Sequence, residues 1–359
     1  MDMTLIIAEA GVNHNGDEKL AFELVDAAYK AGADIIKFQT FKAKNLVTGH
    51  AQQAAYQIAN TQKRESQLEM LSRLELSWET HHALVNYCNS LGIEFLSTAF
   101  DSESLHFLVS ELGLKRLKLP SGELTNAPLV LEYARTGCDI IISTGMASLA
   151  EIEAALAVVA FGYTTSEDAT PCATAFEQAY ISSAGQKALK QKVTLLHCTT
   201  EYPAPINEIN LRVIDTLHSA FDLPVGYSDH SEGIFVPVAA VARRATVIEK
   251  HFTLDKNMTG PDHKASLEPT ELTEMVKAIR QVEQALGHKI KAATTSEIKN
   301  KDIARKSLVA ARDISTGEQF TEENVVIKRP GNGMSPYLYW SVIGKRSTQS
   351  YHSGDLIIE

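Results

Sequence analysis

The sequence has no apolar run that approaches the ~18 residues needed to cross a bilayer. Its N-terminus, "MDMTLIIAEAG", has an acidic second residue and a short apolar run, which predicts neither a signal peptide nor a membrane anchor. The four cysteines, Cys88, Cys138, Cys172 and Cys198, are far apart and lack the paired spacing of metal sites, which favours structural thiols in a reducing compartment. We therefore expect a cytoplasmic protein that has no membrane partner.

Basic residues are too few for a surface that binds nucleic acid. The chain has 34 Lys and Arg against 44 Asp and Glu, a net charge of −10, and no basic block alternates with aromatic residues. A local pocket can still bind small anions. With 359 residues, 44% of them hydrophobic, the chain is long enough for one large domain and a small one.

Eight short apolar runs recur along the chain, with helix-length segments between them. One of these segments opens with Ser148 followed by Glu151, which is typical of a helix N-terminus. Strands that alternate with helices predict parallel βαβ units. The apolar runs cover residues 4–11, 34–40, 93–100, 116–123, 139–146, 193–199, 223–230 and 246–252.

Eight such units favour a closed (β/α)8 or TIM barrel over an open doubly wound sheet. No G-x-G-x-x-G follows the first run, so nothing indicates a Rossmann dinucleotide site. Each run begins with aliphatic residues and ends with polar ones. Because barrel enzymes place their chemistry at the C-terminal mouth of the strands, these polar ends are the candidate site.

Several segments depart from the regular unit. Residues 41–76 form a long excursion on the mouth side and could act as a lid. Residues 161–190 belong to the opposite face, where a structural or assembly role is expected rather than a catalytic one. The predicted domains are a barrel over residues 1–286, a charged linker over 287–304 and a small β-rich domain over 305–359.

Polar side chains at the strand ends share one face because residues two apart point the same way along a strand. Burying so many polar groups without partners would cost on the order of several kcal/mol, so convergence on a ligand is the economical interpretation. The residues predicted to meet at the mouth are Glu9, Lys37, Gln39, Thr98, Lys118, Ser143, Ser228, His230, Glu249 and His251.

The two histidines stand at the ends of neighbouring predicted strands. Neutral imidazoles with open coordination positions suit a divalent cation, with Mn²⁺, Co²⁺ and Mg²⁺ as candidates. Lys37 and Lys118 suit carboxylate or phosphate oxygens. Two alternatives stay open for Lys118: a structural ion pair with Glu9 or Glu123, and a Schiff base of the class I aldolase type.

Two further cations are harder to assign. Arg329 precedes a Pro-Gly-Asn-Gly turn in the small domain, which would present the guanidinium on a stiff loop. Lys250 lies between Glu249 and His251 and must point to the outer side of the barrel, where we expect a carboxylate on a helix as its partner.

The motifs resemble those of bacterial sialic acid (nonulosonic acid) synthases, in order from residue 5 to about residue 345. They are "AEAGVNHNGD", "KFQTF", "KLPSGEL", "ISTGMA", "LLHCTTEYP", "GYSDH", "IEKHFT", "GPDH" and "RPGNG". The C-terminal part is similar to an antifreeze-like (SAF, β-clip) domain.

The resemblance implies an enzyme that condenses phosphoenolpyruvate with an open-chain N-acetylated hexosamine and releases phosphate. N-acetylmannosamine, giving N-acetylneuraminate, is the first expectation. The alternative is 2,4-diacetamido-2,4,6-trideoxymannose, giving N,N'-diacetyllegionaminate. Thr200 stands where one branch of the family has Asn, which leaves the sugar open.

The resemblance also implies roles for individual residues. His230 and His251 would hold the metal, with Mn²⁺ as the first candidate. Glu249 would be the general base for the attacking water, with a metal-bound water of lowered pKa as the alternative. Tyr202, Asp262, Glu9 and Glu249 would contact the sugar or the intermediate, and the SAF domain of a swapped homodimer would bring Arg329 to the partner's barrel. The groups expected to bind phosphoenolpyruvate are Lys37, Gln39, Thr98, Lys118, Ser121, Ser143 and Ser228.

Overall fold

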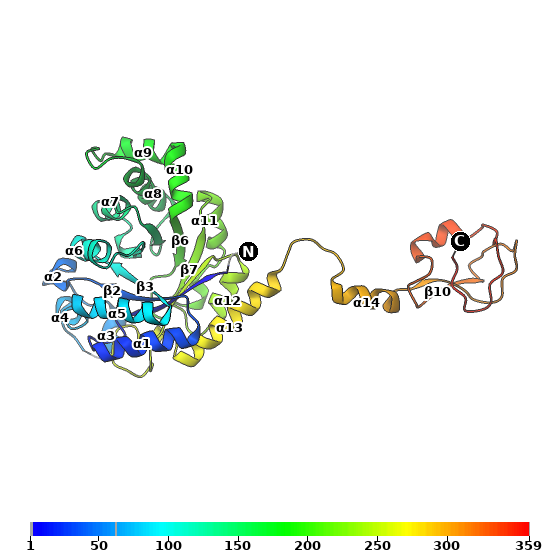
Figure 1. Cartoon of the computed structure of the whole chain (residues 1–359), viewed down its shortest axis with the longest axis horizontal. Helices are drawn as coiled ribbons and strands as arrows, with labels where there is room; N and C mark the ends of the chain where they lie inside the picture. Colours follow the sequence, from blue (N-terminus) through cyan, green and yellow to red (C-terminus); the bar gives the residue numbers. More distant parts are fainter. Residues whose placement is uncertain (1–2, 62, 359) are drawn as a thin grey trace. The chain divides into compact units, whose positions relative to one another are not determined.

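The computed structural model describes residues 3–61 and 63–358. The chain divides into two compact units, one extending to Gly287 and the other beginning at His288 (Figure 1). No helix within the described residues is long and apolar enough to span a membrane.

The first unit is a closed barrel of eight parallel strands in the order in which they occur in the sequence, which confirms the predicted TIM barrel. Each strand lies within its predicted apolar run. The strands are β1 (Leu5–Gly11), β2 (Ile35–Thr40), β3 (Glu94–Ala99), β4 (Arg116–Leu119), β5 (Asp139–Ser143), β6 (Val193–Cys198), β7 (Val225–Asp229) and β8 (Val247–His251).

Strand alternation divides the barrel into an inner and an outer core. The outward-facing side chains pack with the surrounding helices in one large hydrophobic cluster. Inside the barrel lies a separate small apolar layer made of Ile7, Ile35, Leu96, Ile141, Leu196 and Val247. The next inward position on each strand, toward its C-terminal end, is polar on most strands, so the apolar layer is the floor of a polar mouth.

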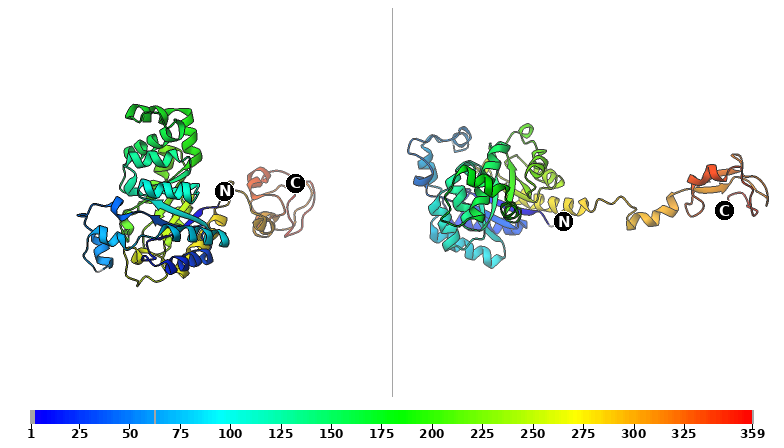
Figure 2. Two further views of the ribbon diagram at one scale, coloured as in Figure 1. Left: turned by 60° about the vertical axis from the view of Figure 1, so that its left-hand side comes forward. Right: turned by 90° about the horizontal axis from the view of Figure 1, so that it is seen from above.

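Helices surround the barrel in both views of Figure 2. They are α1 (Glu18–Ala31), α2 (Ala43–Leu46), α3 (Ala55–Thr61), α4 (Gln67–Ser72), α5 (Trp78–Leu91), α6 (Ser102–His106), α7 (Ala127–Arg135), α8 (Leu149–Thr164), α9 (Ala173–Ile181), α10 (Ser183–Lys192), α11 (Val213–Phe221), α12 (Phe235–Ala242) and α13 (Pro269–Leu286).

The helix predicted from Ser148 is confirmed as α8. The Ser148 side chain accepts a hydrogen bond from the backbone N–H of Glu151, and the Glu151 carboxylate accepts one from the backbone N–H of Ser148, which completes a capping box. The segment 161–190 forms the end of α8 together with α9 and α10, which pack against α8. It joins the C-terminal end of α8 to the start of β6, at the face opposite the mouth.

The second unit contains α14 (Thr295–Ala304) and an antiparallel pair, β9 (Ser307–Ala310) and β10 (Val325–Lys328). The short helix α15 (Tyr339–Val342) follows. Helix α14 lies in the segment that was expected to be a plain linker; its Thr294 cap forms a capping box, and none of its residues is buried. The core of the unit is small: Leu308, Ala310, Ile314, Phe320, Val325, Val342, Tyr351 and Ile357.

Candidate active site

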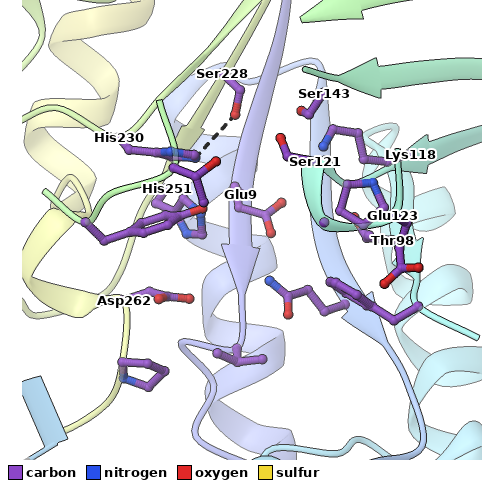
Figure 3. A pocket seen from close by; sticks show the side chains of 18 of the residues that line it. Glu9, Thr98, Lys118, Ser121, Glu123, Ser143, Ser228, His230, His251 and Asp262 are labelled. Atoms are coloured by element: carbon purple, nitrogen blue, oxygen red, sulfur yellow. Dashed lines mark hydrogen bonds between the residues drawn. The ribbon is translucent and has the colours of Figure 1, made fainter. Parts of the chain in front are cut away.

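A pocket with a volume of about 340 Å³ opens at the C-terminal ends of the barrel strands (Figure 3). All of the predicted site residues in the barrel line it. They are Glu9, Lys37, Gln39, Thr98, Lys118, Ser121, Ser143, Tyr202, Ser228, His230, Glu249, His251 and Asp262. Arg329, the remaining predicted residue, belongs to the second unit, where its Nε donates a hydrogen bond to the Ala304 carbonyl at 3.0 Å.

The strand register explains why these residues meet. Glu9 of β1 pairs with Lys37 of β2 on one side and with His251 of β8 on the other. Thr98 of β3 pairs with Lys118 of β4. Residues at one level of a barrel that share inward orientation converge on its axis, so residues far apart in sequence come into contact.

Two lysines and two glutamates form a buried charged cluster at the base of the pocket. Lys37 Nζ lies 3.0 Å from Glu9 Oε2 and 2.7 Å from Glu249 Oε2. Lys118 Nζ lies 3.5 Å from Glu249 Oε1, which also accepts a hydrogen bond from Ser228 Oγ at 2.8 Å. Lys118 therefore pairs with Glu249, whereas Glu9 or Glu123 was the partner expected for a structural pair.

The surroundings move the pKa values of the two carboxyl groups in opposite directions. Burial raises the pKa of Glu9 to about 7, against the attraction of Lys37. Burial also acts to raise the pKa of Glu249, but Lys118 and Lys37 outweigh it and hold that pKa well below its usual range. Burial lowers the pKa of Lys118, with Glu249 opposing this effect. Glu249 is therefore the fixed negative charge of the cluster.

The two histidines lie side by side, with ring centroids 5.7 Å apart. His230 Nδ1 lies 2.6 Å from the Thr199 carbonyl. His251 Nδ1 is buried and finds no hydrogen-bond partner among the described residues. Burial lowers the pKa of His230 to about 4 and the pKa of His251 well below its usual value, so both imidazoles are neutral at neutral pH.

Hydroxyl groups without partners mark the other side of the pocket. Ser143 Oγ and Thr200 Oγ1 are buried and have no hydrogen-bond partner within residues 3–61 and 63–358. Ser121 Oγ accepts a hydrogen bond from the Gly145 backbone N–H at 2.9 Å. Because buried polar groups are normally satisfied, the free hydroxyls indicate a place where a ligand supplies the partner.

The two histidines and Lys118 lie on different sides of one cavity. Figure 3 shows Glu9 in the middle, with His230, His251 and Asp262 on one side and Lys118, Ser121 and Ser143 on the other. Asp262 reaches the cavity from the loop after β8, and burial raises its pKa to about 6. Tyr202 lies over His230, with ring centroids 4.1 Å apart.

The predicted lid provides an apolar wall. Residues 41–76 contain α2, α3 and α4, and they line the pocket with the apolar side chains of Leu46, Val47, Met70, Leu71 and Leu74 and with the amides of Gln57 and Gln67. Several of these side chains pack with Val12 and Phe100 in a small hydrophobic cluster of their own. The pocket therefore combines a charged floor with an apolar side.

Sequence reasoning missed or misplaced several neighbours of the site. Cys198 lines the pocket, and its inward position two residues after Leu196 on β6 was the available signal. The expected helix carboxylate beside Lys250 was wrong: Lys250 pairs with Asp229, which lies at the end of a strand. Asp229 and Lys250 are register partners on the neighbouring strands β7 and β8. This register could not be predicted from the sequence.

A closed (β/α)8 barrel with a charged, partly unsatisfied pocket at its C-terminal mouth is the architecture of a barrel enzyme. The NeuB family model matches residues 24–291 and the SAF domain model matches residues 305–357.

The chain is similar to named synthases over most or all of its length. The chain is 51% identical to an N,N'-diacetyllegionaminic acid synthase of Campylobacter jejuni, with full coverage of both chains. It is 44% identical to the enzyme of that name from Legionella pneumophila, over 98% of this chain and 93% of the relative. A solved sialic acid synthetase from Leptospira borgpetersenii is 31% identical, with a TM-score of 0.66, over 83% of this chain and 90% of the other. The chain belongs to the NeuB family, carries a SAF domain and is an enzyme of the nonulosonic acid synthase type.

Proposed function

We propose that this synthase condenses phosphoenolpyruvate with 2,4-diacetamido-2,4,6-trideoxymannose to form N,N'-diacetyllegionaminate and phosphate. The sequence alone favoured N-acetylmannosamine as the sugar. The alternative now has the better support, because identity is 51% to a relative named for the legionaminate product and 31% to one named for sialic acid.

One observation supports the proposal: a single cavity has lysine and hydroxyl groups, which suit an anion, on one side of Glu9 and two neutral imidazoles, which suit a metal-bound carbonyl, on the other. Among the described residues Lys118 forms an ion pair with Glu249 alone, at 3.5 Å, and it lines the same pocket as the free hydroxyl of Ser143. These groups suit the phosphate and carboxylate of phosphoenolpyruvate. Thr98, Gln39, Ser121 and Ser228, which line the same pocket, are the other proposed contacts of phosphoenolpyruvate. Lys37 already pairs with two carboxylates, Glu9 and Glu249. Its proposed role is to orient these two side chains, and its contact with the carboxylate of phosphoenolpyruvate is secondary.

His230 and His251 fit a divalent cation, with Mn²⁺ preferred over Co²⁺ or Mg²⁺. The unpartnered Nδ1 of His251 and the neutrality of both rings provide nitrogen lone pairs. The described residues contain no group of three or more His, Cys, Asp or Glu side chains placed to hold a metal. A two-imidazole site leaves positions for water and substrate, and the bound ion would polarise the sugar aldehyde as a Lewis acid.

In the proposed reaction, C3 of phosphoenolpyruvate bonds to the aldehyde carbon, water adds at C2, and the tetrahedral intermediate loses phosphate. Glu249 was the expected base for the water. Its two oxygens contact Lys37, Lys118 and Ser228, whereas Oε1 of Glu9 makes no ion pair with any described residue. We therefore assign the base to Glu9 and the stabilisation of positive charge at C2 to Glu249.

The apolar wall supports a sugar that lacks a hydroxyl at C6. A methyl group packed against Leu71 and Met70 would be stabilised by burial, whereas a hydroxyl there would lose its water. Tyr202 and Asp262 are the proposed polar contacts of the same sugar.

A swapped homodimer, in which Arg329 contacts the sugar in the partner's barrel, also belongs to the proposal. No arginine lines the pocket among the described residues, and Arg329 is exposed on its own unit. The four cysteines are free thiols, which supports a cytoplasmic enzyme; cell fractionation would test this compartment.

The decisive experiment is a phosphate-release assay with phosphoenolpyruvate and Mn²⁺. N-acetylmannosamine, its 6-phosphate and the 2,4-diacetamido sugar are compared in parallel, with EDTA and Lys118→Met as controls. We expect the highest kcat/KM with the diacetamido sugar and no turnover in EDTA. Faster turnover of N-acetylmannosamine would reverse the sugar assignment.

A lysine-dependent aldolase is the competing function, since burial lowers the pKa of Lys118 as a Schiff-base amine requires. Borohydride treatment in the presence of sugar distinguishes the two. Covalent labelling of Lys118, together with turnover in EDTA, would contradict the synthase mechanism.

A further inference from the structure

A buried ion pair lies on the outer side of the barrel directly behind the two histidines. Lys250 of β8 and Asp229 of β7 are register partners, and Lys250 Nζ lies 2.6 Å from Asp229 Oδ2. Both side chains are completely buried. Lys250 Nζ also donates a hydrogen bond to the Ser231 carbonyl.

The other oxygen of Asp229 organises the turn that follows β7. Asp229 Oδ1 accepts hydrogen bonds from the Ser231 backbone N–H at 3.0 Å and from Ser231 Oγ at 2.7 Å. The Tyr227 hydroxyl donates to the same oxygen at 3.0 Å. His230 therefore lies between two residues that are both fixed to the Lys250 side chain.

Strand alternation connects this network to the pocket. Asp229 and Lys250 point outward, and each has a histidine as its neighbour in sequence, His230 after Asp229 and His251 after Lys250. Both histidines point inward and line the pocket, whereas neither member of the pair does. A displacement of one strand end relative to the other would change the 5.7 Å separation of the imidazole rings.

Stability alone does not account for such a pair. Removing two charges from water is costly, and apolar side chains of similar volume are often at least as stabilising. What an apolar pair cannot supply is the directional set of hydrogen bonds to the Ser231 carbonyl, N–H and hydroxyl. The pair touches neither imidazole; the His230 ring itself is bonded to the Thr199 carbonyl, so the pair acts through the backbone on either side of His230 and at Lys250.

We infer that Lys250 and Asp229 are positioning residues, which set the distance and orientation of His230 and His251 for the sugar-binding side of the site. The inference rests on the proposed function for the identity of the bound ion. The arrangement of the two rings is a property of the protein itself and can be measured without any ion.

The test compares Lys250→Met, the double variant Lys250→Met/Asp229→Leu, and Arg280→Met. The last removes an ion pair with Asp34, 2.8 Å long, at the opposite end of the barrel. Thermal melting reports stability, Mn²⁺ titration followed by electron paramagnetic resonance reports affinity, and NMR of ¹⁵N-labelled histidine reports the imidazoles of the metal-free protein.

Lys250→Met leaves Asp229 buried without a counter-charge, so we expect a large loss of stability. The double variant should regain only part of the melting temperature lost in Lys250→Met, because Tyr227 and Ser231 lose their acceptor. It should bind Mn²⁺ ~10–100-fold more weakly, with shifted imidazole signals for His230 and His251. Arg280→Met should lose stability and keep both signals. A double variant with wild-type imidazole signals would overturn the inference. If the wild-type protein binds no Mn²⁺, the proposed metal site is wrong. The comparison of imidazole signals between the double variant and the wild type would still test the positioning role of Lys250 and Asp229.

Discussion

At the residue scale, alternation along the strands was the informative pattern. It predicted that Glu9, Lys37, Glu249 and His251 share the mouth, and the structure brings them together. It could not predict that Lys37 bridges both glutamates, because the choice of partner depends on strand register and on side-chain geometry across three strands. On the outer side of the barrel, the partner of Lys250 could not be predicted for the same reason, because its pairing with Asp229 depends on the register of β7 and β8.

The residues of the apolar wall are the first place to test sugar choice. Leu71→Gln should lower the preference for the 6-deoxy sugar over N-acetylmannosamine, measured as the ratio of kcat/KM values, by about 10-fold or more, because a polar group replaces apolar contact. Leu68→Gln, on the same helix but not lining the pocket, is the matched control. Equal ratios in both variants would remove Leu71 from the sugar site.

Gly145 tests the hydroxyl side of the pocket. A methyl group at this position would lie 2.3 Å from Thr200 Oγ1 and 2.9 Å from Ser121 Oγ, so these side chains must move. We expect Gly145→Ala to raise KM for phosphoenolpyruvate about 10-fold or more, since small misplacement of binding groups is costly. Gly49→Ala, whose added methyl meets nothing within 4 Å, should keep the wild-type KM. An unchanged KM in Gly145→Ala would place the substrate elsewhere.

At the scale of elements, the barrel strands were predictable because each lies in a short apolar run, seven or eight residues long, and helix-length segments separate these runs. Other elements were not. Helix α14 has a capping box but buries no residue, so its sequence lacks the apolar periodicity from which a helix is predicted. The described residues of the lid form the short helices α2, α3 and α4. Their positions depend on packing against residues outside the lid, such as Val12 and Phe100, and on local ion pairs.

One of those ion pairs gives the lid a predictable response to pH. Glu65 pairs with both terminal nitrogens of Arg73, at 2.5 and 2.6 Å, and the guanidinium lowers the pKa of Glu65 to about 2 from an ordinary 4.5. A depressed pKa in the folded state contributes stability above pH 4.5 that is lost as the pH falls toward 2.

Hydrogen exchange in residues 63–76 should therefore accelerate over this pH range relative to the barrel strands, after correction for the intrinsic effect of pH. Glu65→Gln should exchange faster at pH 6 and show a weaker dependence. If the variant and the wild type respond equally, the pair does not hold the lid.

At the scale of the whole molecule, the chain consists of two units with separate hydrophobic clusters. The small unit buries only a few large side chains, which is near the lower limit for independent stability. Association with a second copy would add buried surface, and it is also what the proposed role of Arg329 requires.

Mixing two inactive variants tests this association. Arg329→Ala lacks the proposed sugar contact, and His251→Ala lacks a proposed metal ligand. After subunit exchange, a mixed swapped dimer should contain about one working site in two, because one barrel receives an intact partner domain. Mass spectrometry confirms that mixed dimers have formed; mixed dimers without activity would contradict the swapped arrangement.

The apolar layer of Ile7, Ile35, Leu96, Ile141, Leu196 and Val247 has a consequence for the order of events in turnover. It closes the barrel below the charged cluster, so reactants and products share one entrance. If phosphoenolpyruvate binds against Lys118 as proposed, it would have to enter before the sugar covers it. On the proposed arrangement we expect ordered binding, in which the deeper reactant binds first and phosphate leaves only after the product that lies nearer the entrance.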